Sequence, residues 1–79
     1  MKFNAAFELG FRAGYWGRNF NPYQDERNRA AFDMGHEYGQ LAANMPGEKG
    51  KEHFELAKEF IYSLMHFIWL SGSDKASLN

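Results

Sequence analysis

A ten-residue segment that occurs twice constrains this chain more than any other feature of its sequence. Residues 5–14 read AAFELGFRAG and residues 30–39 read AAFDMGHEYG, so five of the ten positions are identical and two more are conservative substitutions. Both copies keep the same glycine spacing, with Gly10 and Gly14 in the first and Gly35 and Gly39 in the second. Two copies are too few for a repeat array, and they predict a pseudo-symmetric pair of segments.

Each copy predicts a helix that carries one flat stripe of small residues. Small residues stand at positions 6, 10, 13, 14 and 17 of the first copy and at positions 31, 35, 39 and 42 of the second. Glycine inside a helix costs roughly 1 kcal/mol relative to alanine, a loss that close packing can offset. We therefore expect the two stripes to face each other at less than the usual interhelical distance. The alternative is that the glycines leave room for a ligand or for the backbone of a partner.

The segment between the two copies sets the expected connection. Asn21 is a good N-cap and Pro22 suits the first position of a helix. The first helix is accordingly expected over about residues 4–18 and the second over about residues 22–44. Because so short a connection leaves no room for the chain to return, the sequence predicts an antiparallel hairpin within residues 1–45.

A third helix is expected from about Lys49 or Lys51 to Leu70, followed by a mobile tail over residues 71–79 that lacks apolar periodicity. Its apolar face is wider than a glycine-rich hairpin of similar length can cover. We therefore expect one small all-α domain over residues 1–79, in which the helix of residues 46–70 also forms a homodimer interface. The residues expected in that interface are Phe60, Leu64, Phe67 and Ile68.

Composition narrows the class of protein further. Of the 79 residues, 44% are hydrophobic and 18% are aromatic, so the chain is expected to fold. It has no cysteine, and therefore neither disulfides nor thiolate metal sites. The net charge of −1 provides no general attraction for nucleic acids. No leader or lipidation motif is recognised, and we expect a soluble, cytoplasmic protein.

The residues do not form a pattern that is typical of catalysis. His36, His53 and His66 lie on separate segments without the spacing of metal ligands. The serines do not stand in a nucleophile elbow, and the glycines lie inside helical repeats and not in a phosphate-binding loop. We therefore expect a binding protein with no catalytic residues, metal or cofactor.

Arginines and aromatic residues alternate around the connection between the repeats. Arg18, Tyr23, Arg27 and Arg29 cluster there, with Tyr15, Trp16 and Phe20 nearby in the sequence. Arginine favours planar, bidentate contacts, and its interleaving with aromatic rings suits the stacking of nucleobases. The same residue types also form protein hot spots. A third interpretation is that the arginines make surface ion pairs while the aromatic residues belong to the core.

Three motifs carry a resemblance to a known family. They are Ala6-x-x-x-Gly10-x-x-Ala13-Gly14-x-x-Gly17-Arg18, then Pro22-Tyr23-Gln24, then Arg29-x-x-Phe32-x-x-Gly35. Residues 6 to about 39 thereby resemble the ribosome modulation factor family of small bacterial proteins, which has phage-encoded relatives. The resemblance implies two helices joined by a linker that bind the small ribosomal subunit near the 3′ end of its RNA and promote ribosome dimerisation and hibernation. It carries the binding role to Arg18, Tyr23, Gln24 and Arg29.

A second functional class remains open. A small, nearly neutral protein that adds a hydrophobic helix to such a hairpin also fits a phage-encoded inhibitor. Its partner would be a host protein such as a nuclease, a defence complex or a polymerase. The two classes predict different salt dependence, because phosphate contacts release counterions whereas an apolar protein interface is nearly insensitive to salt.

Overall fold

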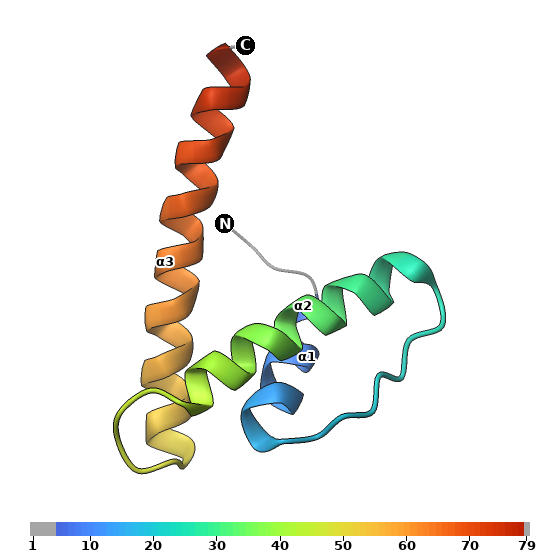
Figure 1. Ribbon diagram of the computed structural model, residues 1–79, viewed down its shortest axis with the longest axis vertical. Coiled ribbons are helices and arrows are strands. Elements are labelled where there is room, and N and C mark those ends of the chain that lie inside the picture. The colour runs from blue at the N-terminus through green and yellow to red at the C-terminus, as the bar shows by residue number, and fades with distance from the viewer. Residues whose placement is uncertain (1–4, 79) are drawn as a thin grey trace.

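Three helices make up the computed structural model, which describes residues 5–78 and, of these, the side chains up to residue 67. They are α1 (Ala5–Trp16), α2 (Glu26–Ala43) and α3 (Lys51–Leu78) (Figure 1). The predicted all-α class is confirmed, and no strand occurs over residues 5–78. The end of α2 and the start of α3 also lie where the sequence predicts them. The structure extends α3 past the predicted end at Leu70.

The glycines of α1 and of α2 lie directly against the backbone of the facing helix. Gly10, Gly14, Gly35 and Gly39 are all buried. A Cβ atom on Gly10 would overlap the carbonyl oxygen of Phe32, and one on Gly35 would overlap the carbonyl oxygen of Phe7. These obstacles are backbone atoms, which cannot move aside as a side chain can. The two helices therefore approach as closely as they do only because four positions carry no side chain.

The contacts also give the direction of the helices. Gly10 meets Phe32 and Gly14 meets His36, so an advance of one turn along α1 is matched by an advance of one turn along α2. The helices are therefore parallel, and the prediction of an antiparallel hairpin is wrong. Gly35 in turn meets Phe7. This contact is the repeat equivalent of the contact between Gly10 and Phe32, because Gly35 follows Gly10 by 25 residues and Phe7 precedes Phe32 by 25 residues. The pair thus has an internal pseudo-two-fold axis.

The connection permits this arrangement because it is longer than predicted. Helix α1 ends at Trp16, where Gly17 takes a left-handed conformation (φ 78°) and the Arg18 amide donates to the carbonyl of Ala13 at 2.8 Å. This is a Schellman-type helix end, which glycine favours. Helix α2 begins only after Asp25, whose carboxylate caps it by accepting from the Asn28 amide at 3.0 Å. Residues 17–25 are thus a linker that is long enough to return beside the pair (Figure 1).

Hydrogen bonds hold the linker along α2. His36 Nε2 donates to the Arg18 carbonyl at 2.6 Å. Further along, Asn21 Nδ2 donates to the Arg29 carbonyl at 3.1 Å, and Arg29 Nη1 donates to the Tyr23 carbonyl at 2.8 Å. The linker therefore runs from the middle of α2 towards its start. Asn21, predicted as the cap of the second helix, instead ties the linker to α2.

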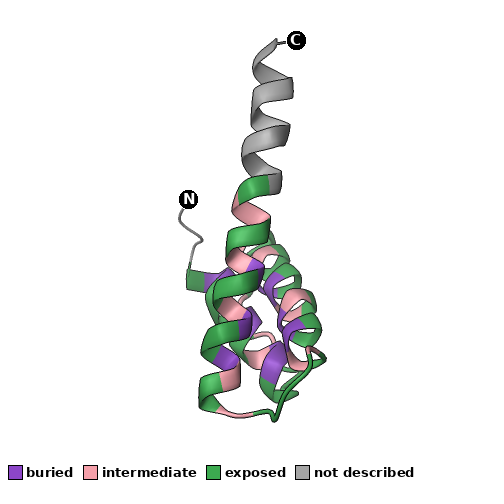
Figure 2. Ribbon diagram, turned by 90° about the vertical axis from the view of Figure 1, so that its left-hand side faces the viewer, coloured by how far each residue is buried: buried purple, intermediate pink, exposed green. Residues whose placement is uncertain are grey.

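Helix α3 packs across the parallel pair and completes the core. In ring contacts between α3 and α1, the centroid of Phe54 lies 5.0 Å from that of Tyr15, and the centroid of Tyr62 lies 5.9 Å from that of Phe7. Later residues of α3 thus meet earlier residues of α1, so α3 runs antiparallel to α1, and it crosses α2 (Figure 1). Figure 2 shows the buried residues where the three helices meet. The core cluster consists of Phe7, Phe11, Tyr15, Ala42, Phe54, Ala57 and Ile61.

A buried hydroxyl group joins the end of α1 to the start of α3. Tyr15 is fully buried, and its oxygen accepts from the Gly50 amide at 3.1 Å. The same hydroxyl lies 2.7 Å from His53 Nδ1, while His53 Nε2 lies 3.0 Å from the carbonyl of Met45. A proton on Nε2 satisfies both contacts, because Nε2 then donates to Met45 and Nδ1 accepts from Tyr15. This network sets where α3 begins.

The residues predicted for an oligomer interface lie on the outer face of α3. Phe60, Leu64 and Phe67 are 58%, 49% and 69% exposed. The side chain of Ile68 lies outside the described residues. Their spacing of four and three residues places these large, exposed apolar side chains on one face of the helix.

Replacing Gly10 with alanine tests the close contact. Alanine would stabilise an exposed helix, but here its methyl group must displace the α2 backbone, so we expect Gly10→Ala to lower the free energy of unfolding by about 2 to 3 kcal/mol. Chemical denaturation followed by circular dichroism measures it. The control is Gly50→Ala, where an added Cβ would meet no atom within 4 Å. It should cost at most about 1 kcal/mol, since alanine is a poorer N-cap than glycine. Equal stability of both variants and the wild type would contradict the close contact.

Candidate nucleic-acid interface

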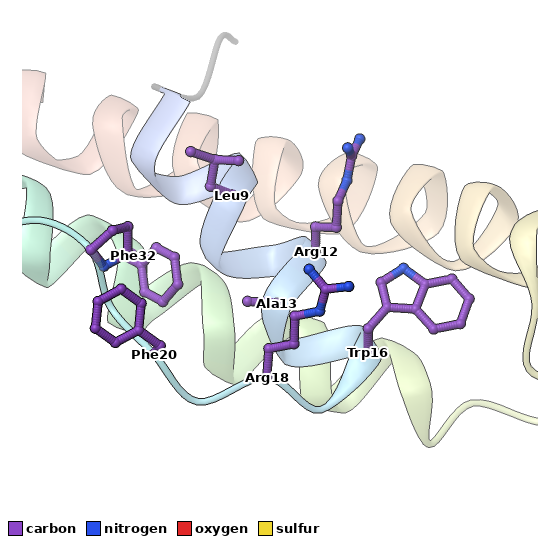
Figure 3. Close-up of a pocket in the computed structure, with 8 residues that line it drawn as sticks. Leu9, Arg12, Ala13, Trp16, Arg18, Phe20 and Phe32 are labelled. Carbon is purple, nitrogen blue, oxygen red and sulfur yellow. The ribbon is translucent and has the colours of Figure 1, made fainter.

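A groove of about 390 Å³ opens beside α1, where the linker returns along α2 (Figure 3). Most of its wall is apolar, and two arginines reach it from α1 and from the linker. We call this the arginine groove. Its lining residues are Leu9, Arg12, Ala13, Trp16, Arg18, Phe20, Pro22 and Phe32.

Aromatic rings form much of the wall. Phe32 is buried at the base, whereas Trp16 is 44% exposed and Phe20 is 78% exposed. Trp16 is held by its ring contact with Tyr15 at a centroid distance of 4.8 Å. Phe20 belongs to the linker, so its position depends on the hydrogen bonds that hold the linker to α2. The groove therefore presents one ring fixed on a helix and one on a loop.

The arginines stand beside these rings. In Figure 3 the side chain of Arg18 reaches from the linker towards Trp16, and Arg12 projects outward from α1. The Arg12 guanidinium also lies 5.8 Å from the ring centroid of Phe54, within the range of a cation–π contact. Exposed guanidinium groups beside exposed rings can contact phosphate and base of the same nucleotide.

Two lysines extend the positive charge around the groove. The Lys49 ammonium lies 5.7 Å from the ring centroid of Trp16, and the Lys58 ammonium lies 5.9 Å from that of Phe54. Lys49 thus lies over a ring that lines the groove, whereas Lys58 lies over Phe54, whose ring centroid is 6.4 Å from that of Trp16. Together with Arg12 and Arg18 they gather four cations on one face of a protein with a net charge of −1.

Tyr62 lies beside this cluster and stays neutral. Burial raises the pKa of the Tyr62 hydroxyl above its ordinary value, Glu8 acts in the same direction, and Arg12 opposes both. The hydroxyl therefore adds no negative charge to the cationic face at any physiological pH.

The pseudo-symmetry explains why the groove exists. Shifted by the 25-residue offset, Phe32, Ala13 and Trp16 of the groove correspond to Phe7, Tyr38 and Leu41. Those three residues lie on the opposite side of the pair, on the surface against which α3 packs, which we call the seat of α3. Phe7 contacts Tyr62 of α3, and Tyr38 and Leu41 line a groove together with residues of α3. On one side the seat is filled by a helix, and on the other by the thinner linker. The arginine groove is the part of the second seat that the linker leaves open.

The predicted binding residues are only partly brought together. Arg18 lines the groove, whereas Arg29 donates to the Tyr23 carbonyl, and the Tyr23 ring packs against Phe32 at a centroid distance of 6.1 Å. Arg29 and Tyr23 therefore shape the linker. Gln24 and Arg27 are exposed and lie outside the groove lining.

The acidic groups near the linker have polar partners of their own. Asp25 accepts from the amide and from the side chain of Asn28, and these bonds lower the pKa of the Asp25 carboxyl. Asp33 accepts from Asn21 Nδ2 at 3.1 Å. Both carboxylates thus organise the backbone of α2 and the linker. The hydrogen bonds observed for these two acids are made to asparagines and not to the arginines that the ion-pair interpretation requires.

Sequence reasoning missed Arg12, Lys49 and Lys58 as members of the site. Arg12 stands four residues before Trp16, so helical spacing alone places it on the same face. The lysines carry no such signal, because only the packing of α3 brings them to the groove.

A second, apolar groove of about 240 Å³ lies between α2 and α3. It is lined by Tyr38, Leu41, Met45, Phe60, Ile61, Leu64 and Met65. Over the described residues there is no group of three side chains that could hold a metal ion. Within the same part of the chain no helix has the length and apolar character to cross a membrane.

Comparison of the chain with protein-family models, with curated proteins and with solved structures finds no match.

Proposed function

We propose that this protein is a non-catalytic RNA-binding protein that acts on the small ribosomal subunit in the bacterial cytoplasm. The proposal rests on the resemblance of residues 6–39 to the ribosome modulation factor family. The observation that supports it best is the arginine groove, which is lined by the exposed rings of Trp16 and Phe20 and by Arg12 and Arg18.

The distribution of charge supports the same function. RNA binding draws much of its affinity from the neutralisation of phosphates, and the net charge of −1 provides none of it globally. Arg12, Lys49 and Lys58 provide it locally around Trp16 and Phe54, and Arg18 adds a fourth cation in the groove. A face with concentrated positive charge can bind RNA even when the charges elsewhere cancel it.

The motif residues then divide between two roles. Arg18 contacts the RNA directly from the groove. Tyr23 and Arg29 act through the linker, because their mutual hydrogen bond fixes the loop that carries Phe20 and Arg18. Gln24 and Arg27 stand exposed beside that loop but outside the groove, and they are assigned no contact with the RNA.

Co-sedimentation with small ribosomal subunits at low salt tests the proposal. The wild-type protein is expected to sediment with the subunits, and the double variant Arg12→Glu, Arg18→Glu is expected to stay in the supernatant because it reverses two charges of the groove. The control is Arg27→Glu, an exposed arginine outside the groove lining, which should retain most of the binding.

Circular dichroism must show equal helix content in the three proteins. Failure of the wild-type protein to sediment with small subunits at low salt would contradict the proposed ribosomal target. Loss of binding in the Arg27 variant to the same extent as in the double variant would contradict the assignment to the groove.

A second candidate function is that of a phage-encoded inhibitor that binds a host protein such as a nuclease, a defence complex or a polymerase. The observation that favours it is the exposed apolar face formed by Leu41, Phe60, Leu64 and Phe67, which we call the α3 face. Contiguous exposed apolar side chains are typical of protein interaction sites. A partner bound at this face would be captured from lysate independently of nuclease treatment and of the groove arginines.

We propose that the α3 face joins two copies in a homodimer when no other protein covers it. Light scattering at tens of micromolar is expected to give twice the chain mass. Phe60→Ser combined with Leu64→Ser should give the monomer mass, because both side chains are about half exposed in the single chain. A wild-type monomer under the same conditions would contradict the dimer. Arg27→Glu is a suitable control, since it leaves the α3 face unchanged.

A further inference from the structure

We infer that the arginine groove binds a short segment of single-stranded RNA, with unpaired bases against Trp16 and Phe20 and phosphates on Arg12 and Arg18. This inference rests on the proposed function and specifies the part of the RNA that the protein recognises. It follows from the size of the groove, from the exposure of its rings and from the position of its charges.

Size distinguishes a nucleotide from a helix as the occupant. The corresponding seat on the other side of the pair holds α3, so a partner helix is the first occupant to consider. The linker already fills part of this seat and is held there by the bonds of His36, Asn21 and Arg29. What remains is about 390 Å³, in the lower part of the range of small-molecule sites, roughly 300 to 1,000 Å³. A nucleotide fits that space, and a helix does not.

Exposure indicates stacking. Of the three aromatic residues that line the groove, Phe32 is buried, whereas Phe20 is 78% exposed and Trp16 is 44% exposed. Large rings left open to water beside a groove gain most when another flat, apolar face covers them. Every nucleobase has such a face, so the stacking would tolerate any sequence.

Charge separates a nucleotide from a purely apolar ligand. Arg12 and Arg18 line the groove itself, and Lys49 and Lys58 lie beyond it over the rings of Trp16 and Phe54. The arginines suit bidentate contacts to the phosphate of the bound nucleotide. The lysines are placed for the phosphates of its neighbours along the strand.

The arrangement requires an unpaired base. In a duplex the faces of each base are stacked on its neighbours, and extrusion of one base costs a few kcal/mol. Single strands, loops and ends present bases without that cost. The groove therefore favours single-stranded over double-stranded RNA of the same length.

Trp16 provides the probe for the test. The chain has two tryptophans, so Trp69→Phe leaves Trp16 as the only one. The fluorescence of this variant is titrated with a single-stranded hexanucleotide of RNA and with the same hexanucleotide annealed to its complement. We expect saturable quenching by the single strand and binding at least about tenfold weaker for the duplex. Equal affinity for the two forms would overturn the inference.

Two pairs of variants locate the contact. In the Trp69→Phe background, Phe20→Ala is expected to weaken the single-strand affinity about tenfold through lost stacking. Leu56→Ala, which removes a similarly exposed apolar side chain outside the groove, should leave it unchanged. Arg18→Gln should weaken binding and reduce its salt dependence, whereas Arg27→Gln should do neither. Quenching that survives both Phe20→Ala and Arg18→Gln would overturn the inference, even if the proteins remain folded.

Failure of the inference and failure of the proposed function give different results. If small subunits still bind the wild-type protein while the hexanucleotide does not, the ribosomal function stands and the nucleotide site is wrong. If the hexanucleotide binds in the groove while small subunits do not sediment with the protein, the nucleotide site stands and the ribosomal target is wrong.

Discussion

The fold depends on the contact between glycine positions of one helix and backbone carbonyls of the next. Gly10 of α1 meets the backbone of Phe32, and Gly35 of α2 meets the backbone of Phe7. The two contacts are equivalent, because the repeat relates Gly10 to Gly35 and Phe7 to Phe32. Each glycine gives up helix propensity, and close packing of two long stretches of backbone offsets that loss. Because any side chain at these positions would meet backbone, the contact fixes the register of α1 and α2. Every other element is placed relative to this pair.

The same contact explains the candidate site. A pseudo-symmetric pair has two equivalent sides, and the chain covers them with different elements. Helix α3 occupies one side and anchors there through the buried hydroxyl of Tyr15. The other side receives only the linker, which leaves the arginine groove open beside Trp16. The cations gather where the side covered by α3 meets the side covered by the linker. Lys58 belongs to α3 and Lys49 lies just before it, whereas Arg12 belongs to α1 and Arg18 to the linker. The groove is thus a consequence of unequal covering of a nearly symmetric core.

Much of this fold can be predicted from the sequence, and the missing parts have definite physical reasons. Periodicity and the repeat identify three helices, and the start of α3 at Lys51 follows from its pattern. The direction of α2 does not follow, because Asn21 and Pro22 resemble a helix start. In the structure Asp25 makes the cap, and Asn21 bonds across to Arg29. That choice between two local caps decides the linker length and hence parallel or antiparallel packing. For the site, the sequence predicts Arg18 as a binding residue and the structure places it in the groove lining, whereas the position of Lys58 depends on tertiary packing that no local pattern carries.

The most direct test of the central claim is a nuclear Overhauser spectrum that relates the α-protons of the glycines to residues of the facing helix. The parallel, glycine-packed pair predicts cross-peaks from Gly10 to Phe32 and from Gly14 to His36, together with the symmetric cross-peak from Gly35 to Phe7. Cross-peaks that pair Gly10 with the end of α2 and Gly14 with its start would show antiparallel helices and contradict the account. The absence of any α-proton contact between the helices would contradict the close packing itself.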